Sequence, residues 1–128
     1  MTAQRFEDLE VWKNARLLCR KIRNLVNKTP LGNDYSIRSQ ILRSGGSCMD
    51  TIAEGFERDG NKEFINFLCI SKGSLGETRS QAYRSFDSGL IDESPFNELI
   101  HDCIQLSSQL SCFIQYLEHS DMKGKKKK

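Results

Sequence analysis

The chain has 128 residues, of which 38% are hydrophobic and 28% are charged, a composition typical of one soluble domain large enough to bury a core. Its apolar runs are far shorter than the roughly 20 residues that a membrane-spanning helix needs, and its first residues lack the apolar segment of a signal peptide. Five cysteines without a CxxC pair fit small buried thiols in a reducing compartment better than disulfides or metal ligands. We therefore expect a cytoplasmic protein without membrane contact.

The net charge of +2 conceals an uneven distribution of charge. Five of the 19 basic residues lie in the last six positions, so the rest of the chain carries 14 basic and 17 acidic residues. Residues 13–28 contain six basic side chains and no acid, whereas residues 90–122 contain six acids and no lysine or arginine. We expect residues 123–128 to form a disordered lysine-rich tail, because they offer no apolar side chain to bury.

Apolar residues that recur at three- and four-residue steps predict an all-α fold without strands. The predicted helices span about residues 8–28, 34–56, 61–88 and 95–119. Proline marks two of their limits: Thr29-Pro30 ends the first helix, and Ser94-Pro95 places a cap and then proline at the start of the last. Because the connections are short, we expect an antiparallel up-and-down four-helix bundle that forms one domain over residues 1–122.

The segment Gln40–Gly55 is the most unusual part of these helices. Its polar side chains form one line at helical spacing, and Gly45 and Gly46 lie at its centre, although each glycine within a helix costs about 1 kcal/mol relative to alanine. A sequence bears that cost where another backbone approaches closely. We therefore expect this helix to press against the third helix, with Ser47 facing Gly73.

The same pairing predicts a buried polar network between these two helices. Arg43 would approach Ser74 and form an ion pair with Glu77, because either charge buried alone would be strongly destabilising. The network comprises Gln40, Arg43, Ser47, Glu54, Gly73, Ser74 and Glu77. Partly buried charges also occur in catalytic pockets, but here we favour a structural role that sets the helix register.

Catalytic or cofactor chemistry has little support in the sequence. The two histidines, His101 and His119, lie 18 residues apart, which is about 27 Å along a helix and too far for them to share a metal in one subunit. No cysteine–histidine spacing suits zinc, and there is no phosphate loop or nucleophile elbow. We therefore expect no enzymatic activity, no metal, no cofactor and no small-molecule substrate.

Several motifs together resemble a known family. The second predicted helix contains Q-I-L-R-S-G-G-S-C-M-D-T-I-A-E-G, followed by F-x-R, E-F-x-x-F-L and K-G-S-L-x-E. With F-E-D-L-E-V-W near the start and D-S-G-L-I before the last helix, residues 6–118 resemble the four-helix-bundle proteins encoded in intervening sequences of bacterial 23S ribosomal RNA genes. The chain departs from that pattern at Ser44-Gly45, where Ala-Ala is usual, at Thr51, where Asn is usual, and at Thr78-Arg79, where Leu-Glu is usual.

The resemblance implies a non-enzymatic bundle that assembles as a homopentameric ring. It also implies kinship with the accessory variability determinant of diversity-generating retroelements, which is thought to bind nucleic acid and a reverse transcriptase. The resemblance therefore says more about the fold than about the activity.

Seven basic residues are the candidates for binding nucleic acid. They are Lys13, Arg16, Arg20, Lys21, Arg23, Arg58 and Lys62. The five on the first predicted helix fall on or beside one face, as phosphate contacts require. Two alternatives remain open: the acids of the fourth helix could balance these charges, within one subunit or between subunits of a ring, or the face could simply be solvated.

The expected function is therefore binding, by a ring-forming homo-oligomer whose favoured nucleic-acid partner is RNA associated with the ribosome, with DNA as the other nucleic acid considered. The alternative is a protein-interaction or self-assembly module without nucleic-acid contact. The lysine tail does little to distinguish these two functions, because it would add only weak, sequence-independent affinity for nucleic acid. A solubilising segment or a remnant added for expression would explain it equally well.

Overall fold

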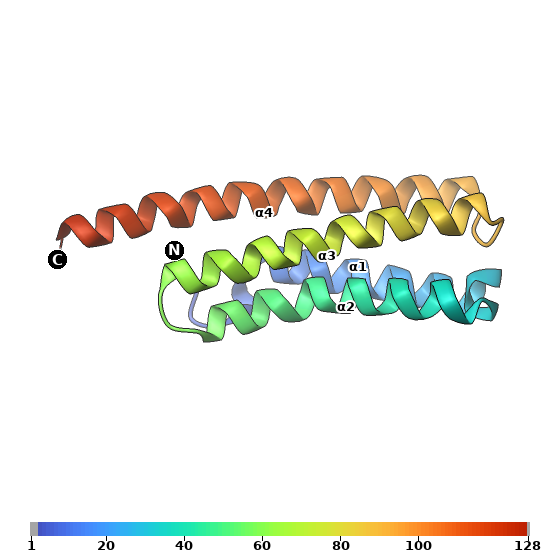
Figure 1. Ribbon diagram of the computed structural model, residues 1–128, viewed down its shortest axis with the longest axis horizontal. Helices are drawn as coiled ribbons and strands as arrows, with labels where there is room; N and C mark the ends of the chain where they lie inside the picture. The colour runs from blue at the N-terminus through green and yellow to red at the C-terminus, as the bar shows by residue number, and fades with distance from the viewer. Residues whose placement is uncertain (1–2, 128) are drawn as a thin grey trace.

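The computed structural model describes the backbone of residues 3–127 and the side chains of residues 3–120. Over these residues the chain forms α1 (Glu10–Lys28), α2 (Tyr35–Glu57), α3 (Asn61–Asp87) and α4 (Glu93–Lys127), with short 3-10 helices η1 (Phe6–Asp8) and η2 (Pro30–Asn33). Successive helices run antiparallel and lie side by side (Figure 1). The described residues contain no strand, and the all-α four-helix bundle is confirmed. Only the backbone is described in the predicted lysine-rich tail, where α4 continues to Lys127, and the disorder expected of residues 123–128 stays a prediction.

Local hydrogen bonds mark where the helices begin and end. The side chain of Asp34 caps α2 by accepting from the backbone N–H of Ile37 at 3.1 Å. Thr29 adopts an extended backbone at the end of α1, and its hydroxyl donates to the carbonyl of Leu25 at 2.5 Å. After α3, Gly89 has a φ of 73°, the left-handed conformation that commonly ends a helix.

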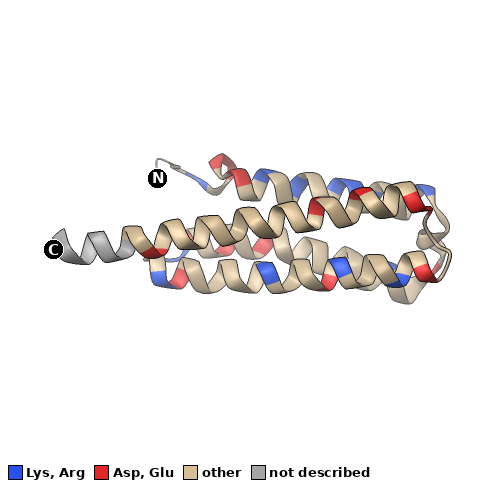
Figure 2. Cartoon of the chain, turned by 90° about the horizontal axis from the view of Figure 1, so that it is seen from above, with Lys and Arg blue, Asp and Glu red and all other residues tan. Residues whose placement is uncertain are grey.

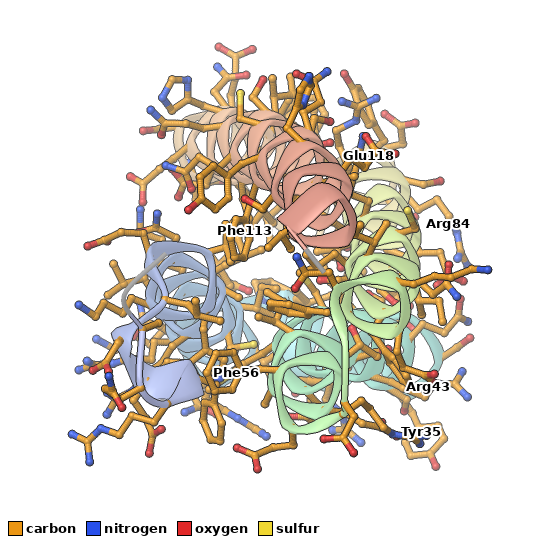
Figure 3. The ribbon with its side chains drawn as sticks, turned by 90° about the vertical axis from the view of Figure 1, so that its left-hand side faces the viewer. Tyr35, Arg43, Phe56, Arg84, Phe113 and Glu118 are labelled. Atoms are coloured by element: carbon orange, nitrogen blue, oxygen red, sulfur yellow. The ribbon has the colours of Figure 1, made fainter. Side chains whose placement is uncertain are left out.

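Apolar side chains from all four helices form one core. Its largest fully buried members include Ile22 of α1, Ile41 and Ile52 of α2, Leu68 and Leu75 of α3, and Leu99 and Leu110 of α4. Aromatic rings close the end of the bundle where α2 meets α3: the ring centroid of Phe64 lies 5.8 Å from that of Phe56 and 5.6 Å from that of Phe113. Figure 3 shows Phe56 and Phe113 between the helices at this end.

Buried hydroxyl groups line the contact between α2 and α3. The Oγ atom of Ser44 lies 2.6 Å from Oε1 of Gln81 and 2.8 Å from Oγ1 of Thr78. A hydroxyl carries one proton, so Ser44 can donate to Oε1 of Gln81 while it accepts from the hydroxyl of Thr78. One turn along, the hydroxyl of Ser71 donates to the carbonyl of Cys48 at 2.7 Å. This contact, which we call the hydroxyl seam, is polar but uncharged.

Two glycines of α2 allow close approach, each to a different neighbour. A Cβ atom at Gly55 would lie 2.5 Å from Cβ of Phe67 and 3.0 Å from Cδ1 of Phe64, both on α3. A Cβ atom at Gly45 would lie 2.8 Å from Cδ1 of Ile22, on α1. The expected close contact with α3 therefore occurs at Gly55, whereas Gly45 serves the contact with α1.

The predicted ion pair between Arg43 and Glu77 is wrong. Both side chains are exposed, and no salt bridge joins either of them to any described side chain. Figure 3 shows Arg43 projecting outward from α2. The next residue, Ser44, is buried instead, because burying a hydrogen-bonded hydroxyl costs far less free energy than burying a charge.

The rest of the predicted network is displaced by about one residue. Oγ of Ser47 lies 3.0 Å from Oγ of Ser74, so Ser47 does not face Gly73 as predicted. Gly73 is exposed, and a Cβ atom there would meet no atom within 4 Å. The remaining members lie outside the seam and make other contacts: Glu54 with Arg58, and Gln40 with Arg84.

The five thiols differ in accessibility, which predicts an order of chemical modification. Burial raises the pKa of Cys19 to about 11 and that of Cys103 to about 12, and it also raises the pKa of Cys48. Cys69 and Cys112 are exposed. Because the thiolate is the reactive form, iodoacetamide at neutral pH should modify Cys69 and Cys112 in the folded protein, and Cys48 and Cys103 only after unfolding. Peptide mass spectrometry measures this order, and modification of folded Cys103 as fast as Cys69 would contradict it.

Candidate nucleic-acid interface

One face of α1 carries a line of exposed basic side chains. Lys13, Arg16, Arg20 and Arg23 recur at three- and four-residue steps, which places them on one stripe of the helix. All four are exposed, whereas the opposite stripe of α1 is buried in the core. The stripe, which we call the α1 ridge, extends about 15 Å along the helix axis. Figure 2 shows its basic segments along α1, while the charged segments in the described part of α4 are acidic.

Little within the subunit neutralises the α1 ridge. Lys13 Nζ lies 3.8 Å from a carboxylate oxygen of Glu10, and the guanidinium of Arg16 lies 5.9 Å from the centre of the Trp12 ring. Arg20 and Arg23 form no salt bridge with any side chain in residues 3–120. The ridge therefore presents cationic groups to solvent, where phosphate oxygens could replace water and counterions.

Lys21 faces a different direction from the ridge. Its Nζ atom lies 2.6 Å from Oδ2 of Asp102 and 3.0 Å from Oε2 of Glu98, both on α4. Hydrogen bonds to Asp102 and then Glu98 raise the pKa of Lys21 above its usual value. The Lys21 side chain is 44% exposed to solvent, so its ion pairs with Asp102 and Glu98 add little to the stability of the fold. Balance of α1 charge by α4 acids thus applies to Lys21 and not to the ridge.

The two candidates at the α2–α3 turn are separate from the ridge. Arg58 bonds Oε2 of Glu54 at 2.9 Å, lies 3.6 Å from a carboxylate oxygen of Glu63, and has its guanidinium 5.0 Å from the centre of the Phe67 ring. Two carboxylates and an aromatic ring thus engage this cation. Lys62 is exposed in the first turn of α3. Neither lies at the end of the bundle where Arg23 is found, because α1 ends at the opposite end (Figure 1).

The structure adds two cations to the seven candidates, one of which, Lys28, was expected to flank the basic face of the first helix. An open cleft of about 840 Å³ lies where α1, η2 and the start of α2 meet, and it is lined by Arg23, Val26, Asn27, Lys28, Thr29, Pro30, Gly32, Asn33, Arg38 and Leu42. Lys28 and Arg38 here join Arg23 of the ridge, and no acid lines the cleft. Arg38 is half-buried, and its Nη1 donates to the carbonyl of Gly32 at 2.8 Å. Arg38 was missed because only the η2 turn brings it to the end of α1.

A metal site, a small-molecule site and a membrane span find less support. The described side chains contain no group of three or more His, Cys, Asp or Glu placed to hold a metal ion. A second cleft, of about 770 Å³, lies between the start of α1 and α4, with Val11 and Phe113 among its walls. None of the predicted functional residues lines it. Among the described helices, none combines the length and the apolar character that crossing a bilayer requires.

Comparison with known proteins identifies the family. The family model described as "23S rRNA-intervening sequence protein" matches residues 7–112. A crystal structure of a protein of unknown function from the S23 ribosomal protein family of Bacteroides thetaiotaomicron shares the fold, with a TM-score of 0.74 and 24% identity, covering 81% of this chain and 97% of the other. A search of curated proteins found no match. Because the family model covers most of the sequence, the chain belongs to the family of 23S rRNA-intervening sequence proteins.

Proposed function

We propose that this protein is a non-enzymatic RNA-binding bundle whose α1 ridge contacts the phosphate backbone. The observation that carries this proposal is the exposure of Arg20 and Arg23 without a salt bridge to any described side chain. Each phosphate that such a cation neutralises releases a counterion, which favours binding at low salt. RNA is the favoured partner because the family is named for ribosomal RNA. Five free cysteines suit the reducing cytoplasm.

A second candidate function is self-assembly, and α3 supplies the observation that favours it. Gly73 and Gly76 lie on the exposed face of α3, and a Cβ atom at either would meet no atom within 4 Å. Each costs about 1 kcal/mol relative to alanine without permitting a close contact inside the subunit. Ile70 and Tyr83, on the same helix, are 52% and 49% exposed. These features suit packing against another copy, in a ring that the family resemblance implies has five members.

Replacing the arginines of the α1 ridge with glutamine distinguishes RNA binding from self-assembly. The variant R16Q/R20Q/R23Q should bind single-stranded RNA at least about tenfold more weakly near 50 mM salt, and the slope of log K against log salt should fall by about two. Fluorescence anisotropy over a salt series measures both quantities, with single-stranded DNA of the same sequence as a comparison.

The matched single variants are Arg20→Gln and Arg79→Gln. Both arginines are exposed without a salt bridge to a described side chain, but Arg79 lies on α3, diagonal to α1 in the bundle (Figure 3). Only Arg20→Gln should weaken RNA binding. If the triple variant binds RNA normally but loses its oligomeric state in light scattering, the ridge serves assembly and the RNA proposal fails.

A further inference from the structure

We propose that the cleft between α1 and α2 holds one unpaired nucleotide of a single-stranded RNA, with its phosphate on Lys28 and Arg38 and its base on Tyr35. This inference rests on the RNA binding proposed above and assigns a further site within it. The site combines a cationic cleft, an exposed aromatic ring and continuity with the α1 ridge.

The lining of the cleft suits a phosphate group. Arg23, Lys28 and Arg38 supply three cations, and Asn27 and Asn33 supply side-chain amides. The bond from Nη1 of Arg38 to the carbonyl of Gly32 fixes that guanidinium at the wall of the cleft. A guanidinium has five N–H donors, so its remaining donors are available for the paired hydrogen bonds that arginine forms with phosphate.

Oxygen atoms near the cleft that would repel a phosphate already accept hydrogen bonds from the protein. The carbonyl of Leu25, in the last turn of α1, accepts from both the backbone N–H and the hydroxyl of Thr29, at 3.0 and 2.5 Å. Asp34 does not line the cleft, and its carboxylate accepts from the backbone N–H of Ile37. The positive charge of the cleft is therefore not balanced by an acid of its own lining.

Tyr35 supplies a surface for a base. It is 73% exposed, more than any other large hydrophobic side chain that the structure describes, and Figure 3 shows it pointing away from the bundle. The guanidinium of Arg38 lies 5.2 Å from the centre of its ring. Arg38 thus connects the cleft to the ring. Exposed aromatic rings beside cations are the usual platform for bases of single-stranded nucleic acids.

Arg23 connects this site to the α1 ridge, because it belongs to both. A strand whose phosphates follow the ridge would therefore reach the cleft at the end of α1. A base can lie on Tyr35 only when it is unstacked from its neighbours, as in loops, bulges and strand ends. The cleft should thus distinguish single-stranded RNA from a duplex, which the ridge alone would not.

The test uses Tyr35→Ala, Tyr35→Phe and Lys28→Gln in the full chain, none of which alters the ridge. Tyr35→Ala should weaken binding of a single-stranded RNA of about 12 nucleotides by about tenfold and leave binding of a duplex of about 16 base pairs unchanged. Tyr35→Phe should bind like the parent protein, because it keeps the ring. Lys28→Gln should weaken binding and lower the salt slope by about 0.7, whereas Arg79→Gln should do neither.

Three results would overturn the site. Equal loss of single-stranded and duplex binding in Tyr35→Ala would show that no unpaired base is bound there. Loss of binding in Tyr35→Phe would exclude stacking as the interaction. Competition by adenosine monophosphate at the same concentration as RNA would make the cleft a free-nucleotide site. If R16Q/R20Q/R23Q weakens binding but the cleft variants do not, the ridge proposal stands and this one falls, whereas no loss in either set rejects RNA binding itself.

Discussion

Replacing Gly32 with alanine should lower the free energy of unfolding by about 3 kcal/mol. The added Cβ atom would overlap the carbonyl oxygen of Val26 and lie 3.2 Å from its carbonyl carbon. These are backbone atoms at the end of α1, so no side-chain rotation can relieve the clash. Either η2 or the last turn of α1 must move, and the bond from Arg38 to the carbonyl of Gly32 would be disturbed. Denaturation in urea, monitored by circular dichroism, measures the loss.

The matched controls are glycines with free space around them. Gly73→Ala and Gly76→Ala should each raise the free energy of unfolding of the monomer by about 0.5–1 kcal/mol, because a Cβ atom there would meet no atom within 4 Å. The explanation from packing would be contradicted if Gly32→Ala were as stable as the parent protein. A Gly73→Ala protein that loses its oligomeric state would instead place this face of α3 in contact with another copy.

The second large effect on the free energy of unfolding should come from the hydroxyl seam. There, the cost of replacing Ser44 should depend on which residue occupies position 78. Ser44→Ala should cost about 1–2 kcal/mol, because Gln81 loses the hydroxyl that lies 2.6 Å from its Oε1. Thr78→Leu should cost about 2–3 kcal/mol, because it adds volume and surrounds the Ser44 hydroxyl with apolar atoms. The double variant S44A/T78L should be more stable than the sum of these costs implies, since alanine makes room for leucine and removes the buried hydroxyl.

A double-mutant cycle on these variants should give a coupling energy of about 1–2 kcal/mol in favour of the double variant. Additive costs would mean that neither the Ser44–Thr78 hydrogen bond, 2.8 Å in length, nor the exchange of volume between the two positions couples their effects on stability.

The fold class could be predicted because apolar periodicity is a local property of each helix. The repeat through Leu99, Cys103, Leu106 and Leu110 follows the buried stripe of α4. The residues in the contact between α2 and α3 were harder to predict, because they depend on the orientation of each helix about its own axis. An error of one residue placed Arg43 where Ser44 lies, and so assigned a charge to a position that holds a hydroxyl. Small polar residues gave no signal strong enough to distinguish these neighbouring positions.

The candidate interface was predictable to a similar extent. Spacing placed four basic residues of α1 on one face, and the structure describes all four as exposed. Spacing alone did not show that Lys21 turns to Asp102 on α4, since that depends on which helix lies alongside. It also gave no indication of Arg38, because the η2 turn sets its distance from Lys28. Periodicity describes one helix at a time, whereas the site is built from two helices and a turn.

The acidic character of the described part of α4 has a consequence for how any polyanion would approach. Basic groups on α1 and carboxylates on α4 give the bundle an electric dipole across its width, so an incoming strand is drawn to one flank and repelled from another. At about 0.1 M salt this bias acts over only about 10 Å, roughly the diameter of one helix. It would therefore orient the final encounter and keep the strand from wrapping around the bundle. The exposed face of α3 would then stay open for protein contacts while α1 is occupied.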